Sequence, residues 1–208
     1  AVKVLPAWRP DKAIAMGDPT TYNDYLDRLE QVSGVQIKKL DDLLQALQLR
    51  HDYFAQQGCR IADHGLSKFP FRKASKTQLD TDFQTIRAGK PLSEEATETL
   101  QTYLLLELAR MNARKGWVQQ IHYGPLRNTN RRMFRQLGPD AGFDTIGDFQ
   151  SAHASIAFLD ELDHEQQLAK TILYNINPSE NDILAAAIGN FQDGSVPGKM
   201  QYGSGWWF

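Results

Sequence analysis

Two histidines stand at the ends of apolar runs that are typical of buried strands. His64 follows the run Cys59–Asp63, and His122 ends the run that begins at Trp117. A neutral imidazole at the end of a strand can bind a metal ion or hydrogen-bond a substrate oxygen. A hydrogen-bonded structural histidine is the plainer interpretation of either residue. We therefore take His122 and His64 as candidate catalytic groups, and His122 also as a candidate metal ligand.

Two arginines follow other apolar runs. Arg9 lies two residues before Asp11, and a planar guanidinium can bind a carboxylate through two parallel hydrogen bonds. A simple ion pair between Arg9 and Asp11 is the alternative. Arg127 can supply donors to hydroxyls or to developing negative charge, while the neighbouring Asn128 can cap a helix over residues 129–137. Both arginines are candidates for substrate binding.

A pair of tryptophans, Trp206 and Trp207, follows the small residues Gly203-Ser204-Gly205. Small residues let the backbone approach a ligand, and an indole offers an apolar wall with one N–H donor, which suits the C–H face of a sugar. Large aromatic side chains more often pack in a core. We expect one of the two indoles to contact a ligand and the other to pack.

Apolar runs alternate with helical patterns along the chain, which predicts β-α-β construction and a parallel α/β sheet. The expected strands are Val2–Leu5, Cys59–Asp63, Trp117–His122, Thr171–Ile176 and Lys199–Tyr202. Apolar residues at helical spacing predict helices over about residues 22–29, 40–54, 93–115, 128–137 and 149–169, and a further one that begins at Ser179. Ser93 is expected to cap the third of these helices.

The strands fit either an open doubly wound sheet or part of an eight-stranded barrel, and their spacing does not choose between the two. No glycine-rich phosphate turn of the kind common in open sheets follows the first expected strand. Loops rich in polar and aromatic side chains follow each strand instead, as at the active-site face of a barrel. Residues 67–115 exceed a barrel connection and are predicted to be a helical insertion between barrel units at 1–66 and 116–208.

The composition bounds the class of protein. The 208 residues carry a net charge of −2 and a single cysteine, Cys59, which excludes an internal disulfide framework and favours a cytoplasmic protein. This charge does not favour binding to nucleic acid or to an anionic membrane, and no apolar run approaches the ~20 residues of a membrane span. The apolar ends predict a chain cut from a longer polypeptide.

Several ordered motifs resemble the uronate isomerase (glucuronate isomerase) family of the amidohydrolase superfamily. They are VKVLPAWRPDK at 2–12, GWVQQIH at 116–122 with LRN at 126–128, LGPD at 137–140 with GFD at 142–144, KTILY at 170–174 with NP at 177–178, and GKMQYGSGWWF at 198–208. The resemblance runs from end to end of this sequence but covers only the middle of the family's longer chain. It implies a partial (β/α)8 TIM barrel, roughly strands three to seven, with a helical insertion.

The resemblance also implies an isomerase that converts D-glucuronate to D-fructuronate and D-galacturonate to D-tagaturonate by proton transfer between C2 and C1. Arg9 would hold the uronate carboxylate, and His122 and His64 would orient the C1 and C2 oxygens. It implies a divalent metal, zinc first, in the full-length enzyme and neither nicotinamide nor flavin. The family's His-x-His metal ligands fall outside this sequence, which contains no His-x-His, and so does the proton-transferring aspartate.

Further expectations concern the fragment alone, the full-length protein and two alternative functions. The fragment is expected to be inactive alone, because an arc of strands leaves two unpaired edges and an uncovered interior. The full-length protein is expected to be a homo-oligomer that binds a hexuronate sugar, with no nucleic acid and no membrane as partners. The rivals are another amidohydrolase-superfamily reaction, such as hydrolysis or decarboxylation, and a non-catalytic helical interaction module built on residues 67–115.

Overall fold

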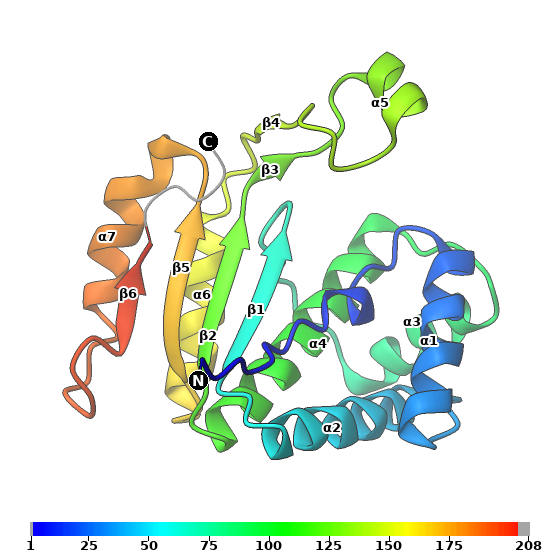
Figure 1. The fold of residues 1–208 in the computed structure, drawn as a ribbon, viewed down its shortest axis with the longest axis horizontal. Helices are drawn as coiled ribbons and strands as arrows, with labels where there is room; N and C mark the ends of the chain where they lie inside the picture. The colour runs from blue at the N-terminus through cyan, green and yellow to red at the C-terminus, as the bar shows by residue number, and fades with distance from the viewer. Residues whose placement is uncertain (1, 204–208) are drawn as a thin grey trace.

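A parallel sheet forms the centre of the computed structural model, which describes residues 2–203 (Figure 1). Its four strands are β1 (Ile61–Leu66), β2 (Val118–Tyr123), β5 (Lys170–Asn175) and β6 (Met200–Tyr202), in that order. The register sets Gly65 opposite His122, and His122 opposite Tyr174. Because all four strands run the same way, the residues that follow them lie along one edge of the sheet.

Seven α-helices of the described residues surround this sheet and extend beyond β1, and not all of them lie on its covered face. They are α1 (Pro19–Ser33), α2 (Leu40–Gln56), α3 (Lys76–Arg87), α4 (Glu94–Arg114), α5 (Arg131–Leu137), α6 (Ala152–His164) and α7 (Asn181–Gly189). In Figure 1 helix α6 lies behind the sheet and α7 lies beside β6. Helix α5 stands out past the carboxyl edge, next to the short antiparallel pair β3 (Pro125–Leu126) and β4 (Thr145–Ile146). Among residues 2–203, no helix combines the length and apolar character needed to cross a bilayer.

The two faces of the sheet differ in burial. In β1, β2 and β5 every second side chain is buried, as expected for strands whose residues alternate between faces. The buried set, which includes Ala62, Ile121 and Leu173, belongs to the hydrophobic core. The intervening residues of β1 and β2 are only half-buried. Helices therefore cover one face, and the other is left partly open.

The expected strand Val2–Leu5 is wrong. Val2 and Val4 are 92% and 87% exposed, and strand pairing begins only at Trp8, whose N–H donates to the Ile61 carbonyl at 3.0 Å. Among residues 2–203, no strand lies beside residues 2–5 to complete their backbone hydrogen bonds. Trp8 does pair with β1. Its ring is also held in place by edge-on packing against His51 and Phe54.

Smaller differences concern where elements begin and end. The second expected strand begins and ends later than predicted, at Ile61 and Leu66, and the helix expected over 149–169 covers only α6. Asn130 rather than Asn128 caps α5, since its side chain accepts from the Met133 N–H. Helix α7 begins at Asn181, after a short 3-10 turn over Pro178–Glu180. The cap at Ser93 is confirmed, because its hydroxyl accepts from the Ala96 N–H.

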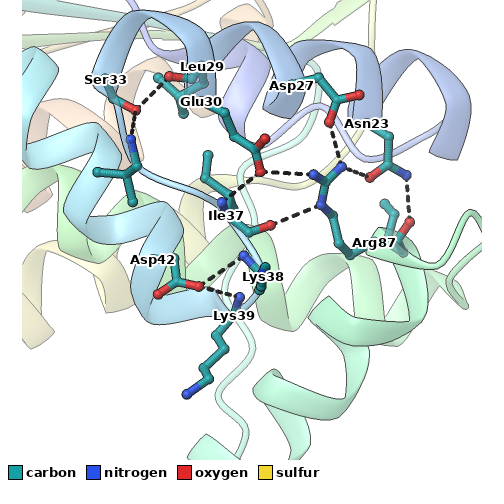
Figure 2. A network of polar contacts seen from close by, with 12 residues as sticks. Asn23, Asp27, Leu29, Glu30, Ser33, Ile37, Lys38, Lys39, Asp42 and Arg87 are labelled. Atoms are coloured by element: carbon teal, nitrogen blue, oxygen red, sulfur yellow. Dashed lines mark hydrogen bonds and ion pairs between the residues drawn. The ribbon is translucent and has the colours of Figure 1, made fainter.

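A polar network around Arg87 ties α3 to α1 and to the segment before α2 (Figure 2). Its guanidinium donates to Asn23 Oδ1 at 2.8 Å, to Glu30 Oε1 at 3.0 Å and to the Ile37 carbonyl at 3.0 Å. Glu30 Oε1 also accepts from the Ile37 N–H at 2.7 Å. One side chain thus joins three segments that are far apart in the sequence.

Candidate active site

A single carboxylate, that of Asp11, gathers three donors beside β1. Its Oδ2 accepts from Arg9 Nε at 3.0 Å and from the Gly65 N–H at 2.9 Å, while Oδ1 hydrogen-bonds His64 Nδ1 at 3.0 Å. Burial opposes the ionisation of Asp11, but the hydrogen bonds from His64, Gly65 and Arg9 together outweigh it, so the pKa of Asp11 lies below its ordinary value. Asp11 thereby fixes the loop after Trp8 on β1.

The guanidinium of Arg9 lies between two carboxylates over the backbone of Gly65. Its Nε contacts Asp11 and its Nη1 lies 3.0 Å from Asp63 Oδ2. A β-carbon at Gly65 would lie 2.5 Å from Arg9 Nη2, so this position in β1 must be glycine for the guanidinium to lie there. The Arg9 side chain is 54% exposed. It is therefore held in place by three neighbours and still accessible from the open side.

His122 lies next to this cluster on the same face of the sheet. Its Nδ1 lies 2.8 Å from Asp63 Oδ1 and 3.3 Å from the carbonyl oxygen of His64. Its ring stacks on Tyr174, with the centroids 4.5 Å apart and the planes 18° apart. Asp63 thus contacts both Arg9 and His122, and it links the loop after Trp8 to the end of β2.

The structure brings some of the sequence-predicted residues together and not others. Arg9 and His122 meet around Asp63. His64 joins the cluster through Asp11, but it is only 1% exposed and belongs to the buried face of β1. Arg127 lies in the loop beyond β3 and pairs with Asp144 at 2.9 Å. Trp206 and Trp207 lie outside the described residues.

Sequence reasoning gave no role to Gly65 or Tyr174, and it assigned Asp63 only to orienting His64 or to binding elsewhere. The missing signal is the register of the sheet. Gly65, His122 and Tyr174 are direct neighbours on three adjacent strands. The predicted strands end at His122 and Ile176, so aligning their ends would have placed Ile176 beside His122, and only the observed register brings Tyr174 there.

The described residues do not form a metal centre by themselves. Within residues 2–203, no group of three or more His, Cys, Asp or Glu side chains is arranged to hold a metal ion. Asp63 and His122 offer at most two adjacent donors, and a tetrahedral zinc site needs more. A metal at this edge of the sheet would require ligands from outside the described residues.

The candidate cluster lies on the partly open face of the sheet. A cavity of about 740 Å³ lies elsewhere, lined by Met16, Lys68, Arg72 and the first turns of α4. A smaller cleft of about 400 Å³ reaches Asp11 and Gly65, but Arg9 and His122 are not among the residues that line it. The cluster lacks an enclosing wall among the described residues.

Fold and site together define a class of protein. Parallel α/β proteins that carry charged and aromatic side chains at the carboxyl ends of consecutive strands are typically enzymes, with their active sites at that edge. The glucuronate isomerase family model matches residues 1–208. The chain belongs to this family.

Individual relatives agree with the family model. The chain is 48% identical over 207 residues to a uronate isomerase of Bacteroides fragilis, and 49% identical over 205 residues to one of Cellvibrio japonicus. These alignments cover 100% and 99% of this chain and 44% of each relative. The chain therefore spans less than half the length of these relatives.

Solved structures show the same fold. A uronate isomerase from Thermotoga maritima superposes with a TM-score of 0.87 at 26% identity, over 98% of this chain and 43% of that one. A glucuronate isomerase from Caulobacter crescentus gives a TM-score of 0.83 at 26% identity, over 98% and 41%. The arrangement of helices around the parallel sheet is therefore one found in uronate isomerases.

Proposed function

We propose that these residues form the middle of a distorted (β/α)8 TIM barrel, roughly strands three to seven. Five successive positions support this proposal, because the bridge at Trp8 lies beside β1, and β2, β5 and β6 follow in order. The open face of the sheet would become the barrel interior. Residues 67–115 would be a helical insertion between the barrel units 1–66 and 116–208. Further strands would supply the wall that the Arg9–His122 cluster lacks.

Within a protein of the relatives' length, the function is the isomerisation of D-glucuronate to D-fructuronate and of D-galacturonate to D-tagaturonate. The observation that carries this proposal is the guanidinium of Arg9, seated between Asp11 and Asp63 beside His122. A guanidinium has five N–H donors, of which the two carboxylates engage Nε and Nη1. The remaining donors can bind the C6 carboxylate of a uronate.

The neighbouring groups would divide the remaining work. His122 would hydrogen-bond the C1 and C2 oxygens of the open-chain sugar while a proton moves between these carbons. His64, held by Asp11, would support this end of the site. Arg127 and one of Trp206 and Trp207 would complete the walls. The carboxylate that moves the proton would come from outside these residues.

A divalent metal, with zinc as the first choice, would supply Lewis-acid polarisation of the sugar oxygens, and His122 is the candidate ligand from this chain. Other ligands would have to come from outside the described residues. The complete protein would be a cytoplasmic homo-oligomer, with a hexuronate as its ligand and neither nucleic acid nor membrane as a partner.

The test uses the complete enzyme that contains this sequence. Conversion of D-glucuronate to its ketose is followed by proton NMR for the wild type, for Arg9→Met and for the matched control Arg72→Met. Arg72 also contacts two carboxylates, Glu95 and Glu98 of α4, and its side chain is 50% exposed, but it lies in the segment before α3 rather than beside His122. Arg9→Met should lower kcat/KM strongly and the control should not. A change below about twofold in Arg9→Met would contradict the proposal.

A further inference from the structure

The partly open face of the sheet carries an aromatic side chain to which the proposed mechanism gives no role. Tyr174 is the register partner of His122 on the adjacent strand, and the two rings stack with centroids 4.5 Å apart and planes 18° apart. Near-parallel stacking restricts tilting of an imidazole, because a tilted imidazole would collide with the stacked ring beside it. Tyr174 therefore constrains the plane of the His122 ring.

The hydroxyl of Tyr174 is engaged away from the proposed substrate. It accepts from Gln120 Nε2 at 3.3 Å. Gln120 precedes His122 by two residues on the same face of β2, one step further from the carboxyl edge. A hydroxyl bonded there is not placed to exchange a proton with a sugar at the strand ends. The ring of Tyr174, rather than its hydroxyl, is the part that acts on the site.

The far side of the Tyr174 ring lies against backbone. Gly203 donates its N–H to the Leu173 carbonyl at 2.9 Å, just after strand β6. A β-carbon at Gly203 would lie 2.1 Å from Cε1 and 2.2 Å from Cδ1 of Tyr174. The ring is thus wedged between the His122 imidazole and the backbone of Gly203. It has little room to move away from His122.

We propose that Tyr174 is a positioning residue that fixes the plane of the His122 imidazole, while the His64 carbonyl and Asp63, which both lie beside Nδ1, limit its rotation. Two constraints of different kind, a stacked face and polar contacts at Nδ1, are sufficient to orient a planar ring. A fixed imidazole loses little rotational freedom when it hydrogen-bonds a substrate, so the contribution appears in kcat rather than in KM. The catalytic consequence rests on the proposed function, whereas the orientation of the ring does not.

The experiment combines kinetics with NMR on the complete enzyme, labelled with ¹³C at histidine. Tyr174→Leu removes the stacked ring, and Tyr174→Phe keeps the ring but removes the hydroxyl. Tyr202→Leu is the control, because Tyr202 lies on β6 and bonds Asn175 and Asn181 rather than His122. Stacking moves the ring-proton resonances of His122 upfield. This shift should disappear in Tyr174→Leu and persist in the other two variants.

The kinetic expectation follows from the same geometry. Tyr174→Leu should lower kcat about tenfold with KM within about twofold, and Tyr174→Phe should stay within about twofold of the wild type in both constants. An unchanged His122 resonance in Tyr174→Leu overturns the proposal. A loss of kcat in Tyr174→Phe as large as that in Tyr174→Leu also overturns it, because the hydroxyl would then touch the substrate.

Failure of the proposed function, or of one variant to fold, can be distinguished from failure of the proposal for Tyr174. If the wild type does not isomerise uronates, the proposed function fails, and the His122 resonances still decide whether Tyr174 orients the ring. If Tyr174→Leu does not fold, Tyr174→Met replaces it, since a flexible thioether fills similar volume without a flat face. The same loss of the upfield shift is expected there, and its retention overturns the proposal.

Discussion

Replacing Gly65 by alanine adds one methyl group and tests whether the Arg9 guanidinium must lie over the backbone of Gly65. The new β-carbon would lie 2.5 Å from Arg9 Nη2 and 3.6 Å from Asp11 Oδ2. The first distance is too short for any contact, and the second is an ordinary one. The guanidinium must therefore leave its place over the strand while Asp11 can remain. The Arg9 side chain is 54% exposed, so it can swing into solvent without disturbing the core.

The expected effects on stability and on activity differ in size. Losing two partly exposed ion pairs costs about 0–1 kcal/mol each, and replacing glycine by alanine at a compatible backbone position returns about 0.4–1 kcal/mol. The free energy of unfolding should therefore change by less than about 1 kcal/mol. A charge-assisted hydrogen bond to a substrate carboxylate contributes about 1.5–3 kcal/mol, so kcat/KM for D-glucuronate should fall about 10- to 150-fold.

The assay compares kcat/KM and the urea unfolding midpoint of the complete enzyme for the wild type, Gly65→Ala and Gly17→Ala. Gly17 is the matched control, because a β-carbon there would meet nothing within 4 Å. Stability should be nearly unchanged in both variants, and only Gly65→Ala should lose activity. If kcat/KM of Gly65→Ala falls less than about threefold, the position of the Arg9 guanidinium over Gly65 is not needed to bind the uronate.

Three further predictions follow from other sites. Gly203→Ala should push the Tyr174 ring from its place and lower kcat about tenfold, measured as initial rates of ketose formation. Burial lowers the pKa of His51, so the native state resists protonation and stability is lost as the pH falls below the ordinary value of 6.5. His51→Phe should reduce that acid sensitivity, measured as urea midpoints at about pH 7 and 5. Arg87→Ala should destabilise the protein by about 2 kcal/mol in urea unfolding, because it breaks the network of Figure 2, whereas the exposed Arg28→Ala should cost less than about 0.5 kcal/mol.

The alternation of strands and helices was predicted from the sequence and is present, and Arg9 and His122, both predicted to follow or end strands, do meet around Asp63. The ion pair between Arg9 and Asp11 was also predicted, as the alternative to a free guanidinium, and it is present. These features depend on local patterns and on residues two positions apart. Local spacing is sufficient for them.

The placement of His64 shows where local patterns stop. A strand that ended at Asp63 would have left His64 in a loop, free to point at the site. The strand continues to Leu66, because the backbone pairs with β2 over six residues. Successive residues of a strand face opposite sides, so Asp63 and His64 cannot both point to the open face. The pairing partner, rather than the sequence around His64, decides its direction.

The row of residues that runs across the strands at His122 consists of two aromatic rings flanked by two glycines. Two rings, His122 and Tyr174, lie side by side, with Gly65 beyond one and Gly203 beyond the other. Glycine within or beside a strand costs about 0.5–1 kcal/mol relative to alanine. Here both glycines make room for large side chains, the guanidinium of Arg9 and the ring of Tyr174. Partly exposed ion pairs add little stability in return, so the cost is better explained by the need to hold Arg9 and His122 in fixed positions at the edge of the sheet.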